Sequence, residues 1–269
     1  MNNRTDKKAM PSRFSSPCWW EAGVAIVLFA FLVHAMKTVE LTELSVKEMR
    51  QIPQNMLRTV GKMIPPDFSR IIPFLRTLHE TVQMAIVGTV GGALVSLPVA
   101  VLATRKLSPH PAIYYVARTL AALLRTIPPL VWGVIFIPAV GLGPRAGTMA
   151  LFVMTLGFCT RFYAEAMEEV ATEPQEALSA MGTGRFGIIF CAVVPATLPA
   201  FFNAAMFSLE QAVRSSVILG IVGAGGIGNE LEVSMTQHRF DQAAAIIILI
   251  FGLVLAVERA SAYMRSRLS

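Results

Sequence analysis

Residues 81–104 read TVQMAIVGTVGGALVSLPVAVLAT, a stretch without a single charged side chain. Residues 186–209, FGIIFCAVVPATLPAFFNAAMFSL, form a second such stretch, and residues 126–144, TIPPLVWGVIFIPAVGLGP, form a third. A helix needs about 20 mostly apolar residues to cross the roughly 30 Å hydrocarbon core of a bilayer. Three uncharged stretches of this length therefore indicate a protein that spans the membrane more than once.

The rest of the composition agrees with this class. The chain is 54% hydrophobic and only 15% charged, whereas soluble domains carry about 25% charged residues. Three shorter apolar runs, 22–36, 146–160 and 243–257, become long enough to span if flanking charges reach back to the interface. We predict an all-α integral membrane protein with six transmembrane helices, at roughly 20–37, 78–104, 118–140, 146–168, 187–212 and 242–262.

The basic residues predict the orientation. Six spans place both termini on one side, together with Arg105, Lys106, Arg265 and Arg267. The positive-inside rule makes that side the cytoplasm. Residues 37–76 are then external, although they are also rich in Lys and Arg; their loose helical spacing of apolar residues, from Leu41 to Met56, predicts an interfacial helix. The first apolar run is interpreted as an uncleaved signal anchor, and cleavage stays open.

Several other classes are disfavoured. A net charge of +6 could suggest nucleic acid, but the basic residues flank apolar runs instead of forming a stripe with aromatics. The three cysteines lack metal-ligand spacing, and the four histidines are scattered. No nucleophile and base are paired at one depth, so we expect no enzyme activity, no metal and no nucleic-acid partner.

The segment between residues 161 and 199 is acidic, then glycine-rich, then apolar. Glu165, Glu169 and Glu173 have i, i+4, i+8 spacing, which predicts one charged helical face. Thr172 and Gln175 fit a capping box at the start of a short helix. Gly182 is placed to end that helix in the left-handed conformation. Such a short cytoplasmic helix suits docking into another protein.

The spacing in this segment carries a resemblance. Glu176-Ala177-Leu178 is followed by three residues, Gly182, nine residues and then Ala192-Val193-Val194-Pro195. This resembles the EAA loop of permease subunits of ABC importers, with Leu178 and Ala192 as departures. The resemblance implies that the loop couples the membrane helices to an ATPase through Glu176, Ala177, Leu178, Met181 and Gly182.

The resemblance extends from about Thr81 to the C-terminus, through residues 125–129, 141–144 and 223–228. Within the family the chain is most similar to phosphonate importer permeases, with methionine importer permeases as close relatives. It implies a type I permease fold over residues 78–269 with a coupling loop at about 165–187, preceded by an N-terminal anchor and external segment over 1–77. Phosphonates or related phosphorus oxyanions are the implied solutes. Methionine, another small solute, or a self-sufficient secondary transporter are the alternatives.

The same resemblance implies the other subunits of the transporter. A second copy of the chain, most simply a homodimer, would complete the pathway in the bacterial inner membrane. Two ATP-binding subunits and an external solute-binding protein are the other implied partners. ATP and magnesium would bind to the ATPase partner, and no cofactor to this chain.

Two further features are left with alternatives. The glycines between residues 220 and 228 lack the Lys-Ser/Thr ending of a P-loop. They are read either as a gate-side or re-entrant segment or as a plain glycine loop, and the gate candidates are Gly220, Gly223, Gly225, Gly226 and Gly228. Arg118 and Arg125 precede Pro128-Pro129, which is expected to bend or restart the helix. We interpret these arginines as interfacial, and the alternative is a pair that draws an anionic substrate.

Overall fold

The computed structural model describes residues 19–38 and 46–267. All the regular elements in these ranges are helical. The chain divides into two compact units after Thr59. The division predicted from the sequence, an N-terminal anchor and external segment over 1–77 and a permease domain over 78–269, is one of function and stays a prediction.

The first unit contains α1 (Trp19–Thr38) and most of α2 (Val46–Lys62). The first apolar run therefore forms the predicted helix, with its apolar side chains exposed. An interfacial helix was also predicted in this part of the chain. The helix α2 lies there, and its apolar side chains Ile52, Met56 and Leu57 are exposed. Leu41 and Leu44, which belong to that prediction, lie outside the described residues.

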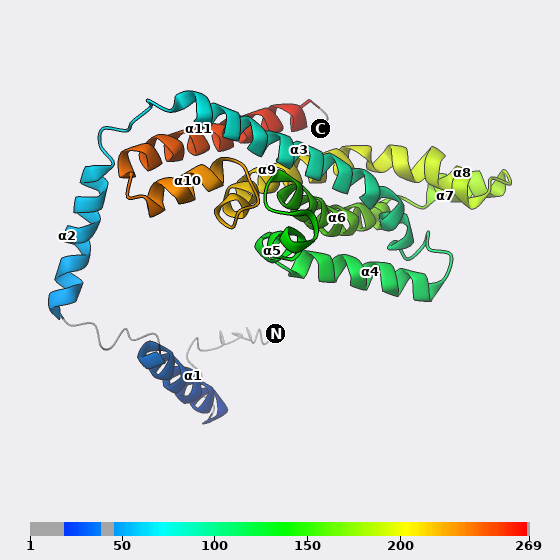
Figure 1. Ribbon diagram of the computed structural model, residues 1–269. Helices are drawn as coiled ribbons and strands as arrows, with labels where there is room; N and C mark the ends of the chain where they lie inside the picture. Colours follow the sequence, from blue (N-terminus) through cyan, green and yellow to red (C-terminus); the bar gives the residue numbers. More distant parts are fainter. Residues whose placement is uncertain (1–18, 39–45, 268–269) are drawn as a thin grey trace, which may run out of the picture. The chain divides into compact units, whose positions relative to one another are not determined.

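The second unit is a bundle built around α6. Contacts join α6 to four other helices, and a long α9 also contacts α3, α10 and α11. Figure 1 shows α3 and α9 running along the bundle, with α4 and α5 on one flank. The helices of this unit are α3 (Ile71–Leu102), α4 (Pro111–Thr126), α5 (Pro129–Val140), α6 (Pro144–Glu169), α7 (Glu173–Ala180), α8 (Arg185–Ile188), the π-helical η1 (Ile189–Val193), α9 (Val194–Ile221), α10 (Ile227–Thr236) and α11 (Phe240–Arg265).

Small residues bring α3 and α6 together. A Cβ atom at Gly88 would lie 2.8 Å from the Leu151 Cβ, and one at Gly92 would lie 2.7 Å from the Phe152 carbonyl oxygen. One turn further, the Ser96 hydroxyl donates to the Leu156 carbonyl oxygen at 3.2 Å. Close backbone approach through small residues is how helices associate where lipid removes the hydrophobic drive between them.

The beginnings of α3 and α11 are tied at Asp67. The Asp67 N–H donates to the Asp241 carbonyl oxygen at 3.1 Å, and the Gln242 side chain donates to the Asp67 carboxylate at 3.3 Å. The Ser69 N–H and the Ser69 hydroxyl also donate hydrogen bonds to that carboxylate. These bonds stabilise its charged form and lower the pKa of Asp67. The link places the starts of these two long helices side by side.

The long apolar helices agree with the predicted spans. Among the described helices, α3, the continuous segment Arg185–Ile221 and α11 are each long and apolar enough to cross a membrane. The α4–α5 pair qualifies together as a fourth span. The span predicted over 146–168 falls on α6, whose 26 residues reach about 39 Å at 1.5 Å per residue, but α6 is less apolar and is not among the helices apolar enough to cross a membrane. The apolar helix Ala22–Thr38, which falls on the first predicted span, is shorter than these helices. Protein neighbours cover much of α6, so its sequence needs fewer apolar residues.

The predicted break at Pro128-Pro129 is present. Helix α4 ends at Thr126, α5 begins at Pro129, and the two axes are bent by 93°. Proline cannot donate the amide hydrogen bond that would continue the helix. The Trp132 indole N–H takes over at the bend and donates to the Leu124 carbonyl oxygen at 3.3 Å.

Candidate functional site

The short helix expected between two spans is α7. It has eight residues, none of them buried. Its end is a Schellman motif: the Gly182 N–H donates to the Ser179 carbonyl oxygen at 2.9 Å, and the Thr183 N–H donates to that of Leu178 at 3.0 Å. Gly182 has φ +80°, the left-handed conformation that the sequence predicted. The carbonyl groups at this end are thus satisfied within the segment.

Two predictions about this segment were wrong. Thr172 occupies the N-cap position but makes no side-chain capping bond, because its own backbone is already helical. Gln175 does not reach back to Thr172, and its amide instead donates to the Ala171 carbonyl oxygen at 3.1 Å. Glu173 does not share a face with Glu165 and Glu169, because α6 ends at Glu169 and α7 is a separate helix.

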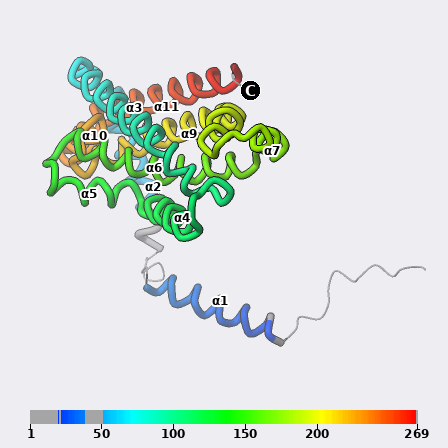
Figure 2. Tube along the Cα trace, turned by 90° about the vertical axis from the view of Figure 1, so that its right-hand side faces the viewer, coloured from blue at the N-terminus to red at the C-terminus, as the bar shows by residue number. Residues whose placement is uncertain are grey.

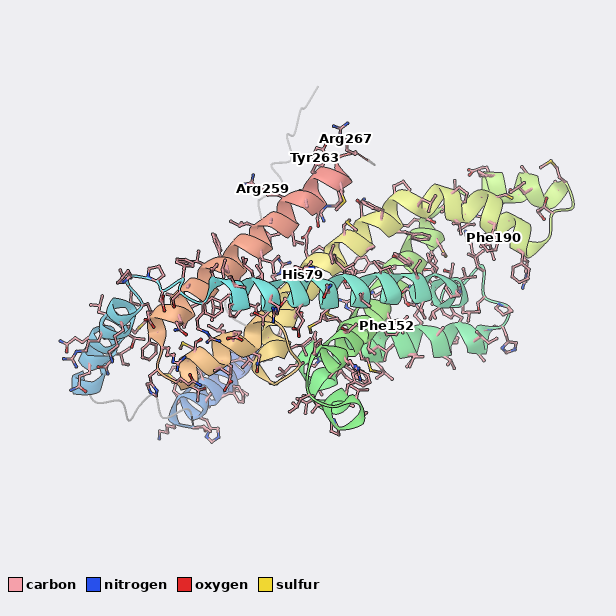
Figure 3. The ribbon with its side chains drawn as sticks, turned by 45° about the horizontal axis from the view of Figure 1, so that its top comes forward. His79, Phe152, Phe190, Arg259, Tyr263 and Arg267 are labelled. Carbon is pink, nitrogen blue, oxygen red and sulfur yellow. The ribbon has the colours of Figure 1, made fainter. Side chains whose placement is uncertain are left out.

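Three large apolar side chains surround α7 without being covered. Met181 is 73% exposed, Phe186 80% and Phe190 67%. The segment lies at the end of the bundle where α6 stops and α9 begins, and Figure 2 views the bundle from that end. Phe190 projects from the same end in Figure 3. Sequence reasoning missed both phenylalanines, although their position just after Gly182 in an uncharged run was a usable signal.

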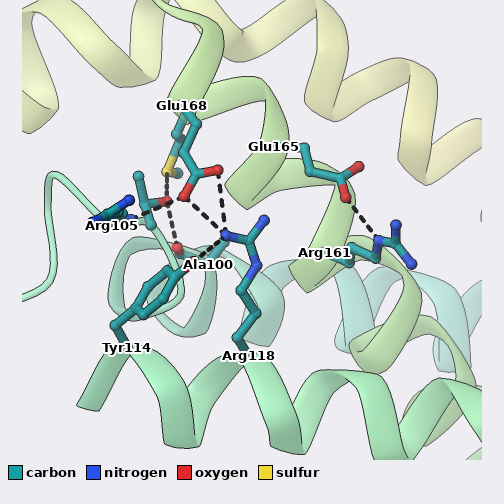
Figure 4. Close-up of polar contacts among 9 residues, drawn as sticks. Ala100, Arg105, Tyr114, Arg118, Arg161, Glu165 and Glu168 are labelled. Atoms are coloured by element: carbon teal, nitrogen blue, oxygen red, sulfur yellow. Dashed lines mark hydrogen bonds and ion pairs between the residues drawn. The ribbon is translucent and has the colours of Figure 1, made fainter. Parts of the chain in front are cut away.

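Ion pairs tie the end of α6 to the neighbouring helices (Figure 4). The Arg118 guanidinium of α4 lies 3.1 Å from the Glu168 carboxylate. The Arg105 backbone N–H donates to the same carboxylate at 3.0 Å. Glu165 is held within α6 by Arg161 at 2.7 Å. Glu168 therefore joins the chain just before α7 to α4 and to the turn after α3.

The glycine segment joins α9 to α10 and is packed inside the bundle. Gly220, Ala224, Gly226 and Gly228 are buried. A Cβ atom at Gly228 would overlap the Val217 carbonyl oxygen, and one at Gly220 would lie 2.7 Å from that of Gly225. Gly223, with φ +86°, faces Leu142. The segment is thus not a plain surface loop, and its role as a gate stays a prediction.

Hydrogen bonds connect this segment to α3 and to the start of α6. The Gly226 N–H donates to the Glu80 carboxylate at 3.2 Å, and the Ile227 N–H donates to the Thr81 hydroxyl oxygen at 2.8 Å. The Gly143 N–H donates to the Gly223 carbonyl oxygen at 2.9 Å. Three parts of the chain that are far apart in sequence therefore meet at this segment.

Two hollows lie along α6 and α9, and they share the rings of Phe158, Phe162 and Phe207. The first, here the glutamate hollow, has a volume of about 530 Å³ and contains Glu165 and Glu169. The second, the arginine hollow, has a volume of about 520 Å³ and is lined by Arg125, Ile127, Pro129, Met154, the three phenylalanines, Ser208, Gln211 and Ser215. The sequence did not predict these hollows, because their walls come from helices that only the fold brings together.

The two arginines of α4 have different surroundings. Arg118 is paired with Glu168. Within the described ranges 19–38 and 46–267, Arg125 has no carboxylate within 4.0 Å. The described residues also contain no group of three or more His, Cys, Asp or Glu that could hold a metal. The described site therefore consists of charged side chains beside two hollows and an exposed short helix.

Comparison with known proteins places these features in a family context. Residues 96–269 match the family model described as binding-protein-dependent transport system inner membrane component. The chain is 41% identical over 208 residues to the phosphate-import permease protein PhnE of Mycolicibacterium smegmatis, covering 77% of this chain but only 39% of that relative. It is 34% identical over 273 residues to the phosphite transport system permease protein PtxC of Stutzerimonas stutzeri, covering 98% of each.

A solved structure shares the fold. The superposition on a chain from the inward-facing MetNI methionine ABC transporter has a TM-score of 0.65. It covers 76% of the present chain and 99% of that chain, at 24% sequence identity. At this identity the match is evidence for the fold alone, which is that of an ABC importer permease.

Proposed function

Because the chain belongs to the binding-protein-dependent transport system inner membrane component family, we propose that it is the membrane permease of an ATP-driven importer for phosphorus oxyanions. The observation that carries this proposal is the exposed α7 at the end of a membrane-spanning bundle. A helix of eight residues is too short to be stable alone in water. Its exposed Met181 and the nearby Phe186 and Phe190 favour docking into a partner's groove.

The energy would come from that partner. ATP and magnesium would bind to two ATPase subunits, each contacting α7 of one permease copy. Closure of the ATPases would push on α7, and the Glu168–Arg118 pair would pass the movement to α4. The long helix from Arg185 to Ile221 would carry it to the buried glycine segment. Alternating access then follows from two arrangements of one bundle.

The pathway would run along the two hollows, completed by a second copy of the chain and supplied by an external solute-binding protein. Relatives named for phosphate and phosphite import support a phosphorus oxyanion as the solute. Methionine is the alternative, supported by similarity to proteins named as probable D-methionine permeases. A self-sufficient secondary transporter is a further alternative from another class.

Reconstitution tests this proposal. The permease is placed in vesicles with an ATPase subunit and a solute-binding protein of a phosphorus-oxyanion importer from the same organism, and uptake of radiolabelled phosphite, phosphate, methylphosphonate and methionine is measured. We expect uptake of at least one phosphorus oxyanion that requires ATP and is lost when the ATPase is omitted. Uptake that continues without the ATPase would support the secondary transporter, and uptake of methionine alone would support that solute.

The orientation can be tested in cells. We propose that both termini are cytoplasmic and that residues 37–76 are external. A cytoplasm-active reporter fused after Ser269 should be active, and the same reporter inserted near Gly61, which has open space around it, should be inactive. A periplasm-active reporter should give the opposite pattern. Cytoplasmic activity at both positions contradicts the predicted arrangement.

A further inference from the structure

Arg125 stands at the bend between α4 and α5, on the wall of the arginine hollow. Its side chain is exposed, and it has no ion-pair partner among the described residues. Arg118, two turns earlier on the same helix, is neutralised by Glu168. The fold therefore leaves an exposed arginine without an ion-pair partner among the described residues on the wall of a hollow.

A second hydrogen-bond donor reaches the same hollow. The Gln211 side-chain oxygen accepts two bonds from Arg214, at 3.1 Å from Nε and 2.9 Å from Nη2. Arg214 is itself paired with Glu258 of α11, which fixes its position. Because the oxygen is occupied, the Gln211 amide nitrogen remains as the group that can bind a ligand, and this nitrogen is a donor only.

The other walls contain no competing charge. None of the residues that line the arginine hollow is acidic. The Ser208 hydroxyl donates to Thr155 at 3.0 Å, and Ser215 contacts the Met154 sulfur at 3.8 Å, so both serines are positioned by α6. Phe158 and Phe207 stack at a centroid distance of 5.4 Å on one side of the hollow. A charged donor such as an arginine binds an oxyanion more strongly than a neutral donor does.

We propose that the arginine hollow is the anion-recognition site of the pathway, in which Arg125 and the Gln211 amide bind the oxygens of a small tetrahedral oxyanion. The inference rests on the proposed function and assigns its substrate class to particular side chains. Arginine and amide donors fit a group that has three acceptor oxygens. Methionine fits less well, since its ammonium group needs an acceptor and the lining offers no carboxylate.

The test uses the reconstituted complex and four substitutions in the hollow, two at Gln211 and two at Arg125. Gln211→Glu keeps the size of the side chain but turns the donor into a negative acceptor, whereas Gln211→Met keeps the size and stays neutral. Arg125→Gln removes the charge, and Arg125→Lys retains it. A charge-assisted hydrogen bond contributes enough for its loss to cost about tenfold or more. We expect phosphite uptake to fall at least about tenfold in Gln211→Glu and Arg125→Gln, less in Gln211→Met, and least in Arg125→Lys.

Arg259→Gln is the matched control. Arg259 is exposed on α11 (Figure 3) and has no ion pair among the described residues. It is not among the residues that line the hollow. This variant should transport like the wild type, and membrane abundance is measured for every variant. If well-inserted Gln211→Glu and Arg125→Gln transport phosphite like Arg259→Gln, the inference is overturned while the importer proposal stands. If the wild type takes up none of the phosphorus oxyanions with ATP, both are overturned.

Discussion

Gly226→Val is expected to lower solute uptake about tenfold or more while leaving the protein inserted in the membrane. Gly226 has φ +78° and ψ −170°, a backbone region that is essentially restricted to glycine. A Cβ atom there would lie 2.5 Å from the Thr81 hydroxyl oxygen. That oxygen accepts the Ile227 N–H and donates to the Thr77 carbonyl oxygen, each at 2.8 Å. The valine must therefore distort the junction of α3, α9 and α10.

The size of the effect follows from the conformation. Forcing a side chain into this region costs about 1–3 kcal/mol, and about 1.4 kcal/mol already corresponds to a tenfold change in an equilibrium. The measurement is ATP-dependent uptake, normalised to the amount of permease in the membrane. Gly252→Val is the control, because a Cβ atom at Gly252 of α11 meets nothing within 4 Å. Wild-type uptake by Gly226→Val would show that the glycine segment does not take part in transport.

Gly182→Val is expected to uncouple ATP hydrolysis from uptake. The glycine has φ +80° at the C-terminal end of α7, but a Cβ atom would meet nothing within 4 Å. The cost of about 1–3 kcal/mol therefore falls on the local backbone, not on packing. Relief of this strain would rotate Met181 and Thr183 and disturb the contact face, while the membrane helices form independently. We predict normal insertion, weaker association with the ATPase and a low ratio of solute transported to ATP hydrolysed.

A neighbouring glycine provides the control. Gly184 has φ −68° and ψ 166°, which any residue adopts, and a Cβ atom there also meets nothing within 4 Å. Gly184→Val should therefore remain coupled, and Gly182→Asn should recover part of the coupling because asparagine tolerates the left-handed conformation. If Gly182→Val stays coupled, the conformation of this turn has no role in transmission.

Cross-linking tests the contact itself. A cysteine at the exposed Ala180 should form a disulfide with a cysteine placed in the groove of the ATPase, in a manner that depends on nucleotide. The natural Cys191 is also exposed, so Cys191→Ser is the background for this experiment. Absence of the cross-link in an active complex would contradict the assignment of α7 as the docking helix.

Much of the fold follows from local sequence signals. Long uncharged stretches predict α3 and α9, a shorter apolar run predicts α11, and Pro128-Pro129 predicts the bend between α4 and α5. Gly182 ends α7 as expected, because a left-handed residue at a helix end strongly favours glycine. Each of these features is determined by the local sequence of a single segment, so a sequence pattern is enough to predict it.

The parts that could not be predicted depend on contacts between segments. The spacing of Glu165, Glu169 and Glu173 assumed one continuous helix, but the chain turns after Glu169. Thr172 matched a capping pattern whose hydrogen bond its backbone conformation does not allow. The difference between Arg118 and Arg125 is set by Glu168, about 50 residues away in the chain, and no local pattern contains that information.

The π-helical turn Ile189–Val193 sets the rotational phase of α8 relative to α9. A π turn holds an additional residue relative to an α-helix, and each helical residue corresponds to about 100° of rotation. Side chains of α8 are thus offset from the positions that an unbroken helix would give them. Ile189 and Val193 face inward, while Phe190 faces outward. The number of residues in this turn therefore sets the direction in which α8, and α7 before it, points from the bundle. Inserting or deleting one residue in the turn would rotate α7 relative to the bundle without changing the sequence of α7 itself.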